Sequence, residues 1–139
     1  MLPAEPLATS KARAVLPASY SRGDVIANLQ SVSLLGLAFA QARGDLLKVA
    51  MCDRIHQPYR APICPMLPRL LPLAGQEGIL GSALSGAGPA VLVVVDKEAS
   101  LGRATAAIGK ALEDMPQPEV IITGFEAQGT VRIATQATQ

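Results

Sequence analysis

The spacing of apolar residues changes after Gly78, and this change limits the chain to a fold that mixes helices and strands. Before Gly78, apolar residues such as Val25, Leu29 and Val32 recur every three or four positions, which is typical of a helix. After it come short β-branched runs such as Val91 to Val95, which are typical of buried strands. Helices followed by strands predict an α+β sandwich with helices packed on one face of an antiparallel sheet.

A single domain over residues 1–139 accounts for these elements. Ser21 and Asp24 resemble a capping box, so they predict the start of a long helix. This helix is apolar on most sides, and we expect it to be buried and covered on both flanks. The sheet is expected to have four strands, and a further helix should follow the second of them. We predict strands at 79–84, 91–95, 120–123 and 130–134, and that helix at 96–114.

Composition and charge exclude several classes of protein. The formal net charge is +1, the basic residues are scattered and only 3% of residues are aromatic, which argues against a nucleic-acid surface and gives no reason to expect membrane binding. Cys52 and Cys64 are expected to be free thiols, and one histidine without a C-x-x-C pair argues against a metal site. No signal peptide is visible, and polar residues interrupt the apolar stretch 25–42, so we expect a cytoplasmic protein.

A loop of small residues, Ser85-Gly86-Ala87-Gly88-Pro89, lies between the first two predicted strands. Two glycines in five residues let backbone N–H groups approach a ligand closely and surround a phosphate or carboxylate. The alternative is an ordinary tight turn between two strands.

Two further segments concentrate polar chemistry. The segment 53–60 holds two arginines, and an arginine can bind a carboxylate through two hydrogen bonds. Alternatively, it is a helix end with solvated charges. In the segment 9–13, Thr9 and Arg13 are four residues apart and share a helix face, although Thr9 can equally be a simple helix cap.

These segments together resemble the motifs of homoserine kinases, which belong to the GHMP kinase family. The matching patterns are T-x-x-A-R-x-x-L-P at 9–17, D-x-x-H-x-x-Y-R at 53–60 and S-G-A-G-P at 85–89. The glycine loop is shared by the wider GHMP family, whereas the middle segment points to homoserine. The resemblance covers nearly the whole chain and implies the C-terminal domain of this fold.

The resemblance also implies an activity, namely ATP-dependent phosphorylation of the side-chain hydroxyl of L-homoserine in threonine biosynthesis. Thr9 and Arg13 would be catalytic, near the reacting hydroxyl and the transferred phosphate. Arg60 would hold the carboxylate of the substrate, and Gly88 would also contact the substrate. Ser85, Gly86 and Ala87 would lie close to the phosphates. ATP and Mg²⁺ are the implied cofactors of the complete enzyme.

One departure from the family pattern limits this hypothesis. The phosphate-binding signature P-x-x-x-G-L-G-S-S-A and the acidic residue that holds magnesium are absent from the chain. We therefore expect a C-terminal half that is inactive alone, binds no cofactor tightly, and self-associates or pairs with a missing N-terminal half. A stand-alone amino-acid-binding or regulatory module, or a GHMP kinase for another small alcohol, remain alternatives, and the role of His56 stays open.

Overall fold

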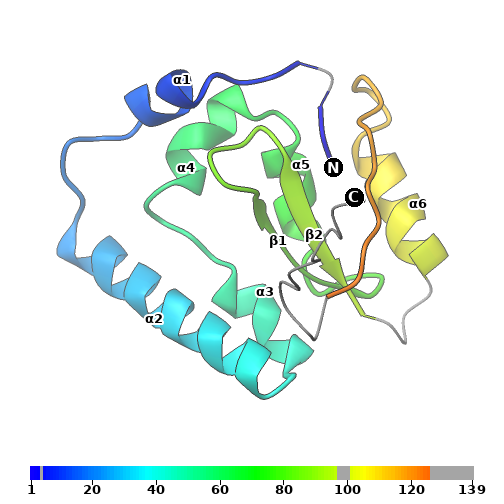
Figure 1. The fold of residues 1–139 in the computed structure, drawn as a ribbon, viewed down its shortest axis with the longest axis horizontal. Coiled ribbons are helices and arrows are strands. Elements are labelled where there is room, and N and C mark those ends of the chain that lie inside the picture. The colour runs from blue at the N-terminus through cyan, green and yellow to red at the C-terminus, as the bar shows by residue number, and fades with distance from the viewer. Residues whose placement is uncertain (4, 97–100, 126–139) are drawn as a thin grey trace, which may run out of the picture.

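The computed structural model describes residues 1–3, 5–96 and 101–125. An α+β fold with an antiparallel sheet is confirmed, and Figure 1 shows its arrangement. The α-helices are α1 (Thr9–Ala14), α2 (Arg22–Ala40), α3 (Leu47–Ala50), α4 (Gln57–Arg60), α5 (Leu67–Leu70) and α6 (Leu101–Ala111). The 3₁₀ turns are η1 (Gly44–Leu46), η2 (Ala61–Ile63) and η3 (Leu71–Leu73), and the strands are β1 (Ile79–Leu84) and β2 (Val91–Val95).

Strands β1 and β2 form an antiparallel hairpin around the glycine loop. The pairing runs from Leu84 opposite Val91 to Ile79 opposite Val95, with one irregularity near Gly81. Both strands therefore have the bounds that the sequence predicted, because β-branched and apolar residues on each side of a glycine-rich turn favour this arrangement. The hairpin places the loop at one end of the sheet, directly after β1.

The prediction of four strands is wrong for the described residues, in which the named sheet has two. Residues 120–123 form no strand, although Glu119 just before them exchanges two backbone hydrogen bonds with Leu2, of 2.8 and 2.9 Å. Met1 in turn exchanges two with Val91, each of 3.0 Å. The N-terminal segment thus lies between β2 and Glu119 as a narrow continuation of the sheet. Within residues 1–3, 5–96 and 101–125 no strand pairs with residues 120–123, and the predicted strand 130–134 lies outside the described residues.

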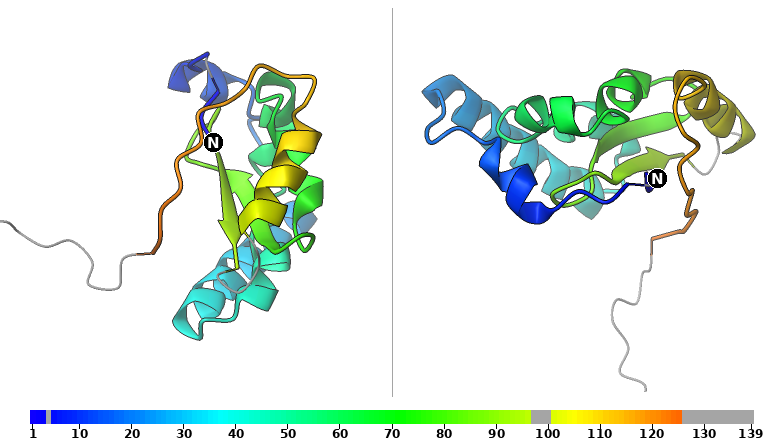
Figure 2. Two further views of the ribbon diagram at one scale, coloured as in Figure 1. Left: turned by 90° about the vertical axis from the view of Figure 1, so that its right-hand side faces the viewer. Right: turned by 90° about the horizontal axis from the view of Figure 1, so that it is seen from above.

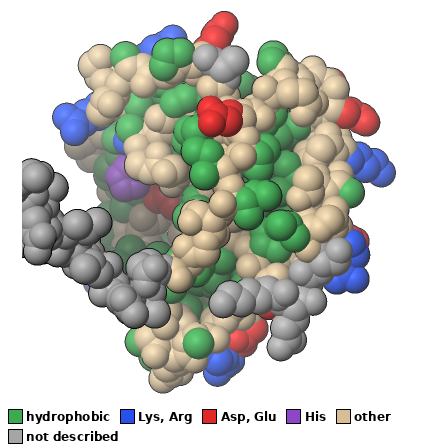
Figure 3. Space-filling model, turned by 45° about the vertical axis from the view of Figure 1, so that its right-hand side comes forward, with side chains coloured by type: hydrophobic (Ala, Val, Ile, Leu, Met, Phe, Trp, Pro, Cys, Tyr) green, Lys and Arg blue, Asp and Glu red, His purple; other side chains and the backbone are tan. Residues whose placement is uncertain are grey.

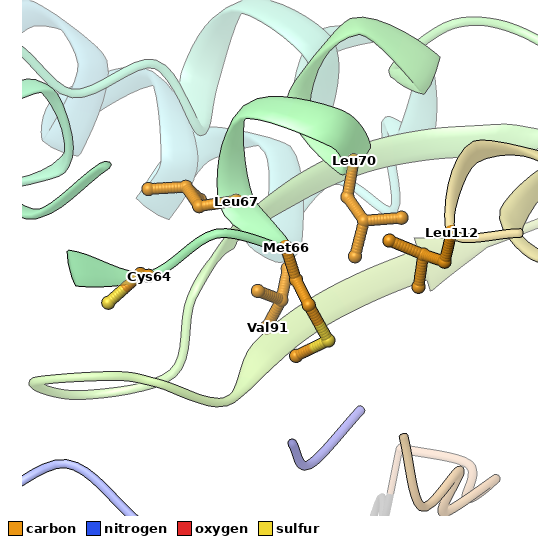
Figure 4. Packing of buried hydrophobic residues seen from close by; sticks show 6 residues of the cluster. All are labelled: Cys64, Met66, Leu67, Leu70, Val91 and Leu112. Carbon is orange, nitrogen blue, oxygen red and sulfur yellow. The ribbon is translucent and has the colours of Figure 1, made fainter. Parts of the chain in front are cut away.

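The main core lies between α5, the start of β2 and the end of α6. Its buried side chains, drawn in Figure 4, are Cys64, Met66, Leu67, Leu70, Val91 and Leu112. Figure 2 shows α5 and α6 side by side against the strands, which agrees with the contacts between them. The predicted helix 96–114 is confirmed over Leu101–Ala111, and residues 97–100 lie outside the described part. This core fixes the hairpin that carries the glycine loop.

Helix α2 begins as the sequence predicted, because the Ser21 hydroxyl oxygen accepts a hydrogen bond of 3.1 Å from the Asp24 N–H. The expectation that this helix is buried on both flanks is wrong for this chain. Ala38 is its one buried residue, and α2 packs on η1 and α3 near its C-terminal end (Figure 1). Leu29 and Val32 are 63% and 65% exposed. Several of the apolar residues that suggested a central helix therefore face outward, whereas Leu35 packs against the cluster around Ala38.

By length and composition alone, α2 is the one helix in the described part of the chain that is long and apolar enough to cross a membrane. Core helices of soluble proteins meet the same criterion, so this is weak evidence for a membrane span.

Candidate functional site

The turn before α4 is organised by the side chain of Asp53. Its Oδ1 atom accepts a hydrogen bond from the Ile55 N–H (3.0 Å), and its Oδ2 atom accepts bonds from the N–H groups of His56 (2.9 Å) and Gln57. Short polar side chains often close a turn in this way by bonding to backbone groups just ahead of them. Asp53 therefore directs the chain into α4, which carries Gln57 and Arg60.

Asp53 is also joined to α2 through Asn28. The Asn28 amide nitrogen donates to Asp53 Oδ1 (2.8 Å), and the Asn28 amide oxygen accepts from the Arg54 N–H (2.7 Å). Burial alone would raise the pKa of the Asp53 carboxyl, but the N–H groups of Gln57, Asn28, Ile55 and His56 together lower that pKa below its ordinary value. The carboxylate form is thus the one that holds the turn.

Arg60 connects the three segments that the sequence singled out. Its side chain is almost completely buried, with the residue 7% exposed. The Nε–H donates to the carbonyl oxygen of Ala12 in α1 (3.1 Å), and Nη1 donates to the carbonyl oxygen of Gly86 in the glycine loop (3.3 Å). Among the described residues, the N–H groups on Nη2 have no acceptor. The Arg60 guanidinium thus connects α1, α4 and the loop, and its Nη2 N–H groups are available to bind a ligand.

The glycine loop adopts a backbone that requires glycine. Gly86 and Gly88 have φ angles of 61° and 86°, in the left-handed region that other residues rarely adopt. The loop is closed by hydrogen bonds from the Ser85 N–H to the Ala90 carbonyl (2.9 Å) and from the Gly88 N–H to the Ser85 carbonyl (3.2 Å). Within the described part of the chain, the N–H groups of Gly86 and Ala87 have no acceptor. The loop can therefore donate hydrogen bonds to an anion.

Cys64 lies beneath this loop. A Cβ atom at Gly88 would come within 3.0 Å of the Cys64 sulfur, so the loop packs closely on the core. Burial raises the pKa of the Cys64 thiol, and the nearby charge of Arg60 opposes this only in part. Cys52 is exposed and both cysteines are free, as the sequence predicted.

Thr9 and Arg13 lie on α1, which reaches the site through Ala12. Thr9 is the first residue of the helix and not its cap; Ala8 occupies the cap position without a side-chain hydrogen bond. Both Thr9 and Arg13 are exposed. The structure therefore brings α1 against α4 and the loop, while the catalytic roles of Thr9 and Arg13 stay predictions.

His56 lies at the edge of the same site. Its side chain is 48% exposed, and its Nδ1 atom lies 3.3 Å from Asp53 Oδ1. Nearby, the ring of Tyr59 meets the ring of Tyr20 edge to face, with 5.9 Å between the ring centres. His56 is thus attached to the turn by Asp53 rather than buried as a core histidine.

Sequence reasoning missed the roles of Asn28 and Gln57. Asn28 interrupts an otherwise apolar stretch of α2, which is the signal that it has a polar partner. Gln57 is 6% exposed; its amide oxygen accepts from the Leu84 N–H (3.1 Å) and its amide nitrogen donates to the Met51 carbonyl (3.4 Å). No local sequence pattern predicts the bond to Leu84, because Gln57 and Leu84 are distant in the sequence.

Charged side chains are dispersed on one face of the molecule. On the face drawn in Figure 3, hydrophobic side chains gather in the middle and the Lys and Arg side chains lie apart from one another near the rim. This face therefore has no continuous basic stripe of the kind that binds a nucleic-acid backbone.

Comparison with known proteins adds the following. The family model described as GHMP kinases C terminal matches residues 36–114. A homoserine kinase of Deinococcus radiodurans is 51% identical over 100 residues, which are 72% of this chain and 33% of that protein. A homoserine kinase of Schizosaccharomyces pombe is 46% identical over 99 residues, covering 68% of this chain and 29% of that protein.

A solved structure is also similar. The crystal structure of a homoserine kinase from Cytophaga hutchinsonii superposes with a TM-score of 0.69 at 25% identity, over 81% of this chain and 36% of that one. The chain thus spans about a third of the length of the relatives that it matches.

Proposed function

This chain belongs to the GHMP kinase family, and we propose that it forms the substrate-side, C-terminal part of a homoserine kinase. The relatives named homoserine kinase support this proposal. The observation that carries it is the position of Arg60, which joins all three motif segments through the carbonyl groups of Ala12 and Gly86. Segments far apart in the sequence thereby meet at one place, as a shared substrate site requires.

The groups at this place suit an amino-acid alcohol and a phosphoryl group. The N–H groups on Arg60 Nη2 can bind a carboxylate in a water-poor setting, where a charged hydrogen bond is strong. Thr9 and Arg13 would lie at the hydroxyl and the transferred phosphate, and the N–H groups of Gly86 and Ala87 would face the phosphates. Phosphoryl transfer depends mainly on positioning and on stabilising developing negative charge, which these groups can provide.

ATP and Mg²⁺ are the cofactors that the family implies for the complete enzyme. Among residues 1–3, 5–96 and 101–125, no group of three or more His, Cys, Asp and Glu side chains could hold a metal ion. The N–H groups of the glycine loop are hydrogen-bond donors that suit phosphate and not a cation, so we assign no magnesium ligand among the described residues. With the proposed activity we also propose that the complete enzyme uses ATP, lies in the cytoplasm and takes part in threonine biosynthesis.

The exposed face of α2 supports a partner for this chain. A shallow hollow of about 470 Å³ lies on it. The hollow is lined by Ile26, Leu29, Gln30, Ser33, Leu34 and Leu37. Exposed apolar surface of this kind marks an interaction site. Because the matched region spans only about a third of each relative, we propose that the polypeptide equivalent to their remaining part covers this face.

The partner proposal has a direct test. The isolated chain should self-associate through α2, and the double variant Leu29→Glu with Val32→Glu should remain monomeric in analytical ultracentrifugation while keeping its helix content. Leu92→Glu is the matched control, because Leu92 is half exposed on β2 and does not line the hollow on α2. Equal self-association of the chain and the α2 variant would remove the proposal.

The activity is tested by joining this chain to the part of the Deinococcus radiodurans homoserine kinase that it does not span. The joined protein should consume ATP in a homoserine-dependent reaction, and the chain alone should not. Turnover with other small alcohols but not homoserine would indicate another GHMP kinase. Homoserine binding by the chain alone in calorimetry, without turnover in the joined protein, would indicate a binding module.

A further inference from the structure

Gln57 connects α4 to the last residue of β1, immediately before the glycine loop. Its side chain is buried, with the residue 6% exposed, although it carries one donor group and one acceptor atom. Both find partners, because the amide oxygen accepts from the Leu84 N–H (3.1 Å) and the amide nitrogen donates to the Met51 carbonyl (3.4 Å). A buried amide with both ends bonded holds its neighbours in one arrangement.

The bond to Leu84 acts on an unpaired edge of the sheet. The next residue, Ser85, directs its N–H to the Ala90 carbonyl across the hairpin. Successive N–H groups of a strand point to opposite sides, so the Leu84 N–H points outward, away from β2. An outward N–H on an edge strand needs a partner other than the sheet, and in the described residues Gln57 supplies it.

Gln57 and Arg60 bond to different positions of the loop region. They lie three residues apart in α4, and they bond to Leu84 at the entry of the loop and to Gly86 at its middle. Asp53 holds the first turn of α4 through the N–H of Gln57, so the backbone from which the Gln57 side chain extends is held in place.

We propose that Gln57 is a positioning residue that fixes the start of the glycine loop and thereby the direction of the N–H groups of Gly86 and Ala87. Its importance for phosphate binding rests on the proposed function, whereas its effect on the loop does not. The segment 53–60 would then position the glycine loop in addition to its proposed role in substrate binding.

The test uses the chain itself and needs no turnover. Gln57→Met keeps the length of the side chain and removes both hydrogen bonds. Amide hydrogen exchange followed by NMR should show that the protection of the Leu84 N–H falls about tenfold or more. The ¹⁵N resonances of Gly86 and Gly88 should shift at the same time.

Ser82→Ala is the matched control. The Ser82 hydroxyl is also buried on β1, and it donates to the Leu70 carbonyl in α5 (3.1 Å), a contact that involves neither α4 nor the glycine loop. This variant should lower the stability of the chain without moving the resonances of the loop glycines. A general loosening of β1 would affect both variants alike.

Gln57→Glu provides a rescue, because it keeps an acceptor oxygen for the Leu84 N–H. Protection of Leu84, taken relative to the free energy of global unfolding of each variant, should be higher in this variant than in Gln57→Met. Unchanged Leu84 protection in Gln57→Met, or glycine shifts as large in Ser82→Ala, would overturn the proposal. Failure of the joined enzyme to turn over homoserine would count against the proposed function alone.

Discussion

Replacing Arg60 by methionine removes the contact that joins α1, α4 and the glycine loop. Methionine retains an apolar stem of similar length, so the change isolates the guanidinium. Two hydrogen bonds disappear, one to the carbonyl of Ala12 and one to the carbonyl of Gly86. The expected result is a chain that still folds but has lost its attachment of α1.

The size of the effect follows from the burial of the two acceptors. A hydrogen bond from a charged donor contributes about 1.5–3 kcal/mol, and a buried carbonyl left without a donor costs about 1–3 kcal/mol. Ala12 is fully buried, whereas Gly86 is exposed and its carbonyl can turn to water. Together these terms predict a loss of about 2–4 kcal/mol in the free energy of unfolding.

Urea unfolding followed by circular dichroism measures this loss. Arg69→Met is the control, because Arg69 pairs with Asp114 at the surface, where both side chains are at least half exposed, and such a pair contributes about 0–1 kcal/mol. Amide exchange should also show early loss of protection in α1, since a helix of six residues does not persist alone. Equal unfolding free energies for the two variants would refute the structural role of Arg60.

Three further predictions concern the turn, the loop and the substrate. The pKa of the Asp53 carboxyl is lowered in the folded chain, so its contribution to stability is complete above the unfolded pKa of about 3.9 and is lost as the pH falls through the folded pKa. In Asp53→Asn, the free energy of unfolding should therefore fall less steeply between about pH 5 and 2 than in the unchanged chain. Gly88→Ala should destabilise the chain by about 1–2 kcal/mol in thermal unfolding, because φ is 86° and the new Cβ would lie 3.0 Å from a sulfur atom. Gly86→Ala meets no atom within 4 Å and should cost less, so a larger loss there would contradict the packing argument. In the joined enzyme, Arg60→Ala should raise the KM for homoserine far more than that for ATP, and equal changes would remove the carboxylate role.

The sequence predicts the elements that depend on local chemistry. The hairpin of β1 and β2 follows from two β-branched or apolar runs around a glycine-rich loop, and the start of α2 follows from Ser21 and Asp24. The third strand was predicted from composition at 120–123, but a strand also needs a neighbour, and composition does not say whether one is present.

For the site, too, the sequence predicts one part and not another. Motif resemblance predicts that segments 9–17, 53–60 and 85–89 belong together, and the contacts of Arg60 with Ala12 and Gly86 agree with it. The atoms that make these contacts are backbone carbonyls 48 and 26 residues away from Arg60. Every residue has such a carbonyl, so no sequence pattern can indicate which ones are used.

The exposure of α2 and the order of the site are connected through Asn28. Apolar packing at Ala38 holds the C-terminal end of α2 on η1 and α3, and such contacts tolerate small rotations. The two hydrogen bonds that Asn28 makes with Asp53 and Arg54 are directional, so they resist such rotations. Asp53 then fixes Gln57, which holds the entry of the glycine loop. Under the proposed function, a polypeptide that covers the apolar face of α2 would therefore also constrain the orientation of α4 and the loop, so α2 would link that polypeptide to the direction of the N–H groups of Gly86 and Ala87.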